Sequence, residues 1–156
     1  MRSPPRADII QPADWPQPSG YSNGVAASGR YVVLAGQIGW DPIRSAFGTD
    51  DFAEQTRQAL SNIAALLREA GGGPQHLVRL TWYVTNRDEY VAARREIGSA
   101  YREIIGAHYP PMTVVVVGGL IEERAKVEIE ATAVIPEEPR TRRPRPADRH
   151  PPPADR

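Results

Sequence analysis

The chain contains no cysteine, only one lysine and no excess of charge of either sign. Without cysteine there can be no disulfide framework, no thiolate nucleophile and no Cys-ligated zinc or iron–sulfur site. The 19 basic and 19 acidic side chains cancel, so the chain lacks the clustered positive charge that usually accompanies binding to nucleic acid. We therefore expect no nucleic-acid partner.

Long apolar segments are also missing. No run approaches the roughly 18 residues that are needed to span a bilayer. The first ten residues lack the apolar stretch of a signal peptide. These absences predict a soluble, cytoplasmic protein with no membrane partner.

Several motifs with known chemistry do not occur. The sequence has no G-x-x-x-x-G-K-[ST], no G-x-G-x-x-G and no H-E-x-x-H. His76, His108 and His150 are too far apart in the sequence to have metal-ligand spacing. Lys126, the single candidate for a Schiff base, shows no sign of burial and is interpreted as a surface charge. We expect neither a metal nor a cofactor.

Proline, by contrast, is abundant at the two ends of the chain. Five of the 16 prolines lie in residues 1–20 and seven in residues 136–156. The second segment also holds six arginines and no Leu, Ile, Val or Phe, so it is predicted to be disordered, with docking to a partner protein as the alternative. We expect a Pro-rich N-terminal extension over 1–20, one domain over 21–135, and a Pro- and Arg-rich tail over 136–156.

Periodicity within residues 21–135 predicts alternating strands and helices. Asp51 and Glu54 resemble a capping box at the start of a helix of about five turns, which ends at Gly71. Gly98 weakens the second predicted helix by about 1 kcal/mol relative to Ala. The expected order is a hairpin of strands 25–27 and 31–35, a helix over 51–70, a strand over 77–85, a helix over 86–105, a central strand over 113–117 and a last strand over 127–135.

The last predicted strand separates two kinds of side chain. Its odd-numbered positions are apolar, while Glu128, Glu130 and Thr132 share the opposite face. Two helices can cover only one face of such a sheet, so the sequence predicts an α+β fold with a half-polar free face. A face of this kind commonly meets a second copy, and we expect a homo-oligomer.

Carboxylates and arginines are the candidates for chemistry on a small-molecule substrate. Glu128 and Glu130 project to the same side, roughly 7 Å apart, so either could act as a general base on water. The alternative is a solvated strand face. Arg94 and Arg95 on the second helix could bind an anionic substrate, or they could be ordinary helix-surface charges.

Six short segments occur in order along residues 21–135. They are Tyr21–Val25, Ala35–Pro42, Asn62-Ile63, Ala70-Gly71, Tyr109–Thr113 and Val127–Ala131. As a set they resemble the Rid family, also called the YjgF/YER/UK family. The resemblance implies a chorismate-mutase-like α+β fold and a homotrimer with helices outside and a cleft between each pair of subunits.

The resemblance also implies an activity. Family members similar to the RidA archetype hydrolyse reactive enamines and imines to a carbonyl compound and ammonia, and they need no cofactor. In their pattern a Glu of the last strand activates water, a Tyr near the first strand closes the cleft, and an Arg before the central strand clamps the substrate carboxylate. These roles map to Glu128 and Tyr21, whereas Met112 occupies the Arg position.

The Met112 position leaves two interpretations open. In the first, the substrate lacks a carboxylate, and Met112, Trp40 and Tyr90 form an apolar pocket for a larger imine. In the second, Arg94 or Arg95 replaces the missing clamp. The adaptability of methionine as a pocket lining slightly favours the first.

The predicted function is a Rid-like enamine or imine deaminase with altered substrate specificity. Glu128 would position water, while backbone amides around Gly36 and Thr113 bind the polar end of the substrate. The alternative is a non-catalytic trimer that binds a small metabolite or regulates a partner. An endoribonuclease is less favoured, because the chain has no His pair for acid–base work on a 2′-hydroxyl.

Overall fold

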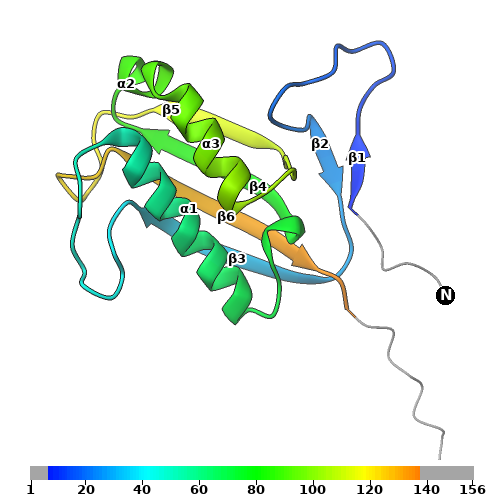
Figure 1. Ribbon diagram of the computed structural model, residues 1–156. Helices are drawn as coiled ribbons and strands as arrows, with labels where there is room; N and C mark the ends of the chain where they lie inside the picture. Colours follow the sequence, from blue (N-terminus) through cyan, green and yellow to red (C-terminus); the bar gives the residue numbers. More distant parts are fainter. Residues whose placement is uncertain (1–6, 138–156) are drawn as a thin grey trace, which may run out of the picture.

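A four-stranded mixed sheet with helices on one face forms the body of the structure, a computed structural model that describes residues 7–137 (Figure 1). The elements are, in order, β1 (Asp8–Ile10), β2 (Gly24–Ala26), β3 (Arg30–Ile38), α1 (Phe52–Glu69), a 3-10 turn (Pro74–His76), β4 (Leu77–Val84), α2 (Arg87–Ala92), α3 (Arg94–Ile104), β5 (Met112–Val116) and β6 (Val127–Ile135). The α+β class predicted from the sequence is confirmed.

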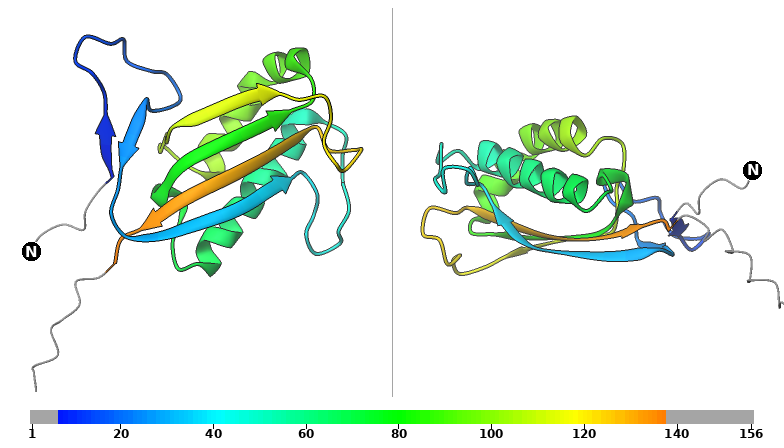
Figure 2. Two further views of the ribbon diagram at one scale, coloured as in Figure 1. Left: turned by 180° about the vertical axis from the view of Figure 1, so that it is seen from behind. Right: turned by 90° about the horizontal axis from the view of Figure 1, so that it is seen from below.

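The strand order in the main sheet is β3-β6-β4-β5. β6 runs antiparallel to both of its neighbours, whereas β5 runs parallel to β4 (Figure 2). The three helices lie together on one side of the sheet, and the other side, called the open face below, is left uncovered (Figure 2). No helix within residues 7–137 combines the length and the apolar composition that crossing a bilayer requires.

The hydrophobic core lies between β6 and α1. All five odd-numbered side chains of β6 are at most 8% exposed: Val127, Ile129, Ala131, Ala133 and Ile135. The first four of them pack with Leu60, Ile63 and Leu67 of α1, which are fully buried. The alternation predicted for the last strand is therefore confirmed, and it places Glu128 and Glu130 on the open face.

The ends of α1 follow the sequence signals. The Asp51 carboxylate accepts a hydrogen bond from the amide of Glu54 at 2.9 Å, which satisfies one of the unpaired N–H groups of the first turn. After 18 residues the helix ends, and Gly71 adopts a φ of 78°, a left-handed conformation that favours glycine.

The capping role of Asp51 leads to a stability prediction. Asp51→Ala is expected to lower the free energy of unfolding by about 1 kcal/mol, measured by urea denaturation, because the cap acceptor is removed. The matched control is Asp50→Ala, which loses only an exposed ion pair with Arg124 at 2.9 Å and should cost less. Equal losses in the two variants would contradict the capping role.

The second predicted helix is two helices. The prediction of one helix over 86–105 is wrong, because the chain turns at Ala93, which ends α2 and begins α3. Tyr90 of α2 packs edge-to-face on Phe52 at the start of α1, whereas α3 buries Ile97 and Tyr101 in the core. Since both segments have apolar residues at helical spacing, the periodicity alone did not reveal the turn.

Two strand predictions are also wrong. β5 was expected to be central, but it is an edge strand, and Val114, Val115 and Val116 are 38%, 38% and 55% exposed. β2 was expected to pair with the following strand, but it pairs with β1 instead. Gly29, with a φ of 150°, lies against the backbone of Ile135, and the chain bends there into β3.

The two ends of the chain differ in what the structure describes. β1 belongs to the predicted extension over 1–20 and forms a small two-stranded sheet with β2 beside the end of the main sheet (Figure 1). The tail predicted over 136–156 lies outside the described residues from 138 onward.

Candidate active site

Glu128 and Glu130 differ in their surroundings, although both project from β6 onto the open face. The Tyr83 hydroxyl donates a hydrogen bond to Glu130 Oε1 at 3.2 Å. Within residues 7–137, Glu128 is half-buried and makes neither a side-chain hydrogen bond nor an ion pair with a described residue. Glu128 is thus the carboxylate whose oxygens are available to water or to a ligand.

Tyr83 stands between the two carboxylates. Desolvation, followed by the hydrogen bond to Glu130, raises the pKa of the Tyr83 hydroxyl. The hydroxyl therefore stays protonated through neutral pH and keeps donating to Glu130. Sequence patterns gave Tyr83 no role, although Tyr83 is the register partner of Glu128 on the neighbouring strand β4.

Gly36 lies directly against the Glu128 side chain. The β3–β6 register shifts between Leu34 and Gln37, so Gly36 sits in a bulge, a feature that often re-aims side chains near active sites. A Cβ added at Gly36 would lie 2.8 Å from Glu128 Cγ and Cδ, and closer still to Oε1. Only glycine leaves room for this carboxylate, and the structure thus brings two of the sequence-predicted residues together.

A second group of predicted residues meets on the other side of the sheet. A cavity of about 710 Å³, called the helix-side pocket below, opens between α2, α3 and the edge of β5. It is lined by Pro18, Ser19, Gly20, Trp82, Tyr90, Arg94, Ile97, Gly98, Tyr101, Arg102, Tyr109, Met112 and Val114. Met112, Tyr90 and Arg94 are therefore neighbours in one pocket, whereas Arg95 does not line it.

The remaining predicted residues lie elsewhere. Trp40, in the loop after β3, packs on Phe47 with the ring centroids 6.4 Å apart and does not line the helix-side pocket. Thr113 pairs with Thr81 and therefore faces the open side. Tyr21 is 43% exposed and lines an adjacent pocket.

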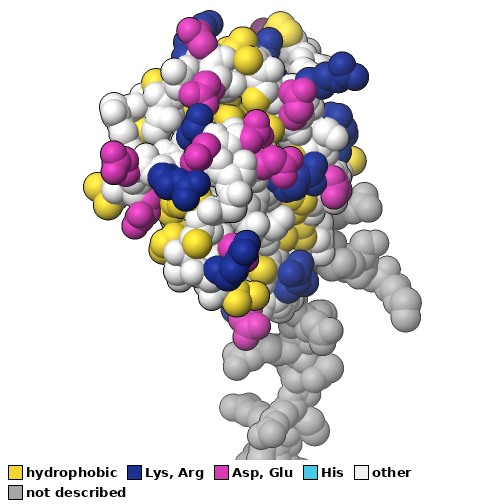
Figure 3. Space-filling model, turned by 60° about the vertical axis from the view of Figure 1, so that its left-hand side comes forward, with side chains coloured by type: hydrophobic (Ala, Val, Ile, Leu, Met, Phe, Trp, Pro, Cys, Tyr) yellow, Lys and Arg dark blue, Asp and Glu magenta, His cyan; other side chains and the backbone are white. Residues whose placement is uncertain are grey.

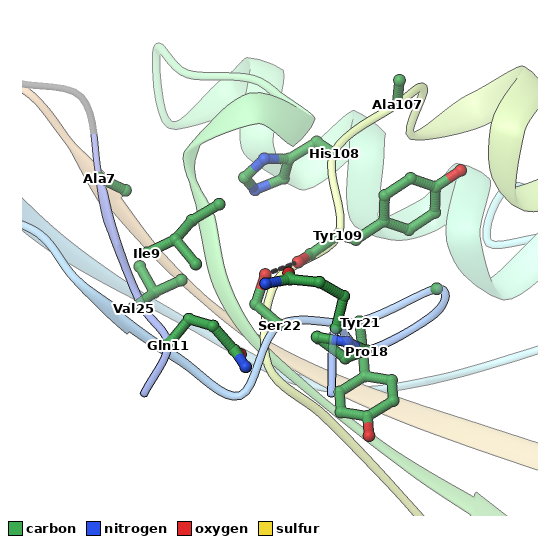
Figure 4. Close-up of a pocket in the computed structure, with 12 residues that line it drawn as sticks. Ala7, Ile9, Gln11, Pro18, Tyr21, Ser22, Val25, Ala107, His108 and Tyr109 are labelled. Carbon is green, nitrogen blue, oxygen red and sulfur yellow. Dashed lines mark hydrogen bonds between the residues drawn. The ribbon is translucent and has the colours of Figure 1, made fainter. Parts of the chain in front are cut away.

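The pocket of Tyr21 connects the N-terminal segment to the loop before β5 (Figure 4). The Ser22 hydroxyl donates to the carbonyl of Tyr109, and the Ser22 amide donates to the carbonyl of Pro110 at 3.3 Å. The Tyr21 ring points away from Tyr109 and His108 (Figure 4). These contacts hold Tyr21 at the outer edge of the domain, because its neighbour Ser22 is bound to the Tyr109-Pro110 segment that leads to Met112.

The two groups lie on opposite faces of the sheet within one chain. Met112 pairs with Leu80, whose side chain is in the core under the helices. Glu128 pairs with Tyr83 on the open face. Among the described residues, the buried polar atoms without a partner, Thr81 Oγ1 and Trp82 Nε1, belong to successive residues of β4 and so lie on opposite faces. A single chain therefore does not bring Glu128 to the helix-side pocket.

Charge over the surface is mixed. Figure 3 shows acidic and basic side chains interspersed on the visible face, with no continuous basic patch. His76 Nδ1 accepts from the amide of Gly73 at 3.1 Å, and His108 Nε2 is 2.7 Å from the carbonyl of Leu77, so both rings contact the backbone. The described part of the chain contains no group of three His, Asp or Glu side chains placed to hold a metal ion.

Comparisons with known proteins add a family and a set of relatives. A family model described as Endoribonuclease L-PSP matches residues 14–135. A RutC family protein of Synechocystis is 34% identical over 130 residues, which cover 82% of this chain and 96% of that protein. A 2-iminobutanoate/2-iminopropanoate deaminase of Bos taurus is 29% identical over 127 residues, which cover 81% of this chain and 88% of the deaminase.

A solved structure agrees with this grouping. A crystal structure of a Rid family protein of unknown function from Yersinia pestis is 34% identical and gives a TM-score of 0.71. The match covers 83% of this chain and 99% of that one. The likeness therefore extends over nearly all of the described fold.

Proposed function

The chain belongs to the endoribonuclease L-PSP family, also called the YjgF/Rid family, and from this premise we propose that it hydrolyses the C=N bond of a small imine, or of the tautomeric enamine, to a carbonyl compound and ammonia. The observation that carries the proposal is the environment of Glu128. This half-buried carboxylate rests against Gly36 and makes no side-chain hydrogen bond or ion pair with another described residue. A general base on water needs such an acceptor.

The reaction needs one water molecule and no redox partner. Glu128 takes a proton from water as the water oxygen bonds to the imine carbon, and the C=N electron pair moves to nitrogen, which takes up that proton from Glu128. The carbinolamine then collapses: the hydroxyl proton passes by way of Glu128 to the nitrogen, the C–N bond breaks, ammonia leaves and the carbonyl forms. Backbone amides around Gly36 and Thr113 would bind the polar end of the substrate.

We place this reaction in a cleft between two copies of the chain in a homotrimer. Glu128 and the helix-side pocket occupy opposite faces of one sheet, so they can join only if different copies supply them. The exposed surfaces support such contacts: β5 presents an apolar edge, and Tyr31 and Val33 of β3 are 68% and 67% exposed. Apolar surfaces of this kind commonly mark contacts with another chain.

A ribonuclease is the less favoured function. The described histidines contact backbone groups, and residues 21–135 hold 11 basic and 13 acidic side chains. Neither feature suits acid–base cleavage of an anionic RNA strand. A non-catalytic metabolite-binding trimer remains the competing proposal, and only a turnover assay separates it from the deaminase.

The test is ammonia release from imines generated in place by an amino-acid oxidase. Purified protein is expected to accelerate ammonia release above the rate in buffer for at least one of three imines: 2-iminobutanoate, a 2-imino acid with a phenyl ring, and an uncharged imine. Light scattering on the same sample should give the mass of three chains. A trimer without acceleration on any of the three would favour the binding protein instead.

A further inference from the structure

The helix-side pocket carries positive charge and no negative charge. Arg94 and Arg102 line it from α3, and no Asp or Glu is among its lining residues. Neither arginine makes an ion pair or a side-chain hydrogen bond within residues 7–137, whereas Arg44, Arg57 and Arg124 each pair with a carboxylate. Two unpaired guanidinium groups in one cavity favour an anionic ligand.

Gly98 lies between the two arginines on the same side of α3. Arg94, Gly98 and Arg102 follow each other at intervals of four residues, which places them along one side of α3. A Cβ at Gly98 would lie 3.3 Å from Nη1 of Arg102, so this guanidinium folds back over Gly98 toward the turn that carries Arg94. Glycine inside a helix lowers helix stability, and here it leaves room for the Arg102 side chain and a ligand.

The rest of the wall is flat and apolar. Tyr90 and Met112 face the cavity from α2 and β5, and Tyr101 stacks on Tyr109 with the ring centroids 5.5 Å apart and the planes at 13°. Aromatic rings and a methionine accept a planar or branched apolar group. A ligand that fits both parts of the pocket therefore has a carboxylate at one end and a bulky apolar group at the other.

We propose that Arg94 and Arg102, separated by Gly98, hold the carboxylate of a 2-imino acid whose bulky apolar side chain packs on Met112 and Tyr90. The inference rests on the proposed function and names its substrate class. The carboxylate clamp then comes from α3 rather than from residue 112. The space beside Met112, which a longer cationic side chain would occupy, is left for the substrate side chain.

The first experiment measures binding without turnover. Phenylpyruvate is the probe, because it keeps the carboxylate and the ring of such a substrate but has a carbonyl in place of the imine. By calorimetry, wild-type protein should bind phenylpyruvate more tightly than 2-oxobutanoate or the uncharged ketone 4-phenyl-2-butanone. Arg94→Gln and Arg102→Gln should each weaken phenylpyruvate binding about tenfold to a hundredfold, as the loss of a charge-assisted hydrogen bond implies.

Three further variants separate a clamp from a structural role. Arg95→Gln is the matched control, since Arg95 neighbours Arg94 on the same helix but does not line the pocket; its binding should stay within about twofold of wild type. Arg94→Lys should restore part of the affinity, because the charge returns without the planar fork. Gly98→Ala should raise the thermal midpoint by favouring the helix and yet weaken phenylpyruvate binding, a combination that a purely structural role would not produce.

Several results would overturn the inference. They are equal binding of phenylpyruvate by wild type and Arg94→Gln, preference for the uncharged ketone, and a change of oligomer mass in Arg94→Gln, which would make Arg94 a residue of subunit packing rather than a ligand clamp. Failure of the proposed function is a separate result: phenylpyruvate binding that depends on Arg94, with no ammonia release from any imine. Conversely, ammonia release that is insensitive to Arg94→Gln and Arg102→Gln would keep the deaminase and reject the clamp.

Discussion

Glu128→Gln is expected to reduce ammonia release by about 10²- to 10⁴-fold, the usual contribution of a positioned general base. Glutamine has nearly the same shape and keeps an oxygen that can accept a hydrogen bond, but it cannot take a proton from water. Because Glu128 is half-buried on the open face and contributes nothing to the core under the helices, the fold and the oligomer mass should not change. The rate on each imine, measured at saturating substrate, checks this prediction.

Glu130→Gln is the matched control. Glu130 lies on the same face of the same strand, but the Tyr83 hydroxyl already binds its carboxylate at 3.2 Å. A glutamine oxygen can keep that hydrogen bond, so the rate should change far less than in Glu128→Gln. If both variants lose activity equally, or if Glu128→Gln keeps the wild-type rate, Glu128 is not the base.

Gly36→Ala is expected to reduce ammonia release by a factor similar to that of Glu128→Gln, although it removes no functional group. The added Cβ would lie 2.8 Å from Glu128 Cγ and Cδ, well inside ordinary contact distance. The end of a flexible side chain can move away, so the expected outcome is a displaced carboxylate in a folded protein. Displacement of about 1 Å at a catalytic group can cost about 10² in rate.

Two measurements distinguish displacement from unfolding. The thermal midpoint of Gly36→Ala should stay near that of wild type, since the colliding atoms belong to a side chain at the surface of the sheet. Gly118→Ala is the control for a Gly-to-Ala change in general, because nothing lies within 4 Å of its added Cβ. Full activity of Gly36→Ala would show that the position of Glu128 against residue 36 is unimportant for turnover.

Much of the fold could be predicted because the signals involved are local. The alternation along β6 and the cap at Asp51 each depend on residues a few positions apart, and both are confirmed. One error concerns an element, the helix that is divided at Ala93, and the errors about β2 and β5 concern strand pairing. An apolar run such as β5 is compatible with a central strand and with an edge strand that contacts another chain, and the residues of the run do not distinguish these two positions.

For the candidate site, too, the sequence identified some residues but not how they are placed relative to one another. Glu128 and Met112 were identified from short segments, and the family resemblance that carried them is confirmed by the match over residues 14–135. Their placement on opposite faces was not foreseen, because it follows from the β4–β5 and β4–β6 registers together. Arg102 carried no sequence signal beyond its spacing of four residues from Gly98.

By itself, the sequence determined most of the helices and strands of the main domain, the apolar side of β6, and that Glu128 projects away from the core. These properties depend on spacing along the chain, since side-chain direction repeats with the period of a strand or a helix. Only the tertiary structure decided that Gly36 supports Glu128, and that Arg94, Gly98 and Arg102 share a cavity with Met112. Hydrophobic burial is non-directional, so it favours a core without specifying which distant segments become neighbours; strand pairing and helix packing settle that.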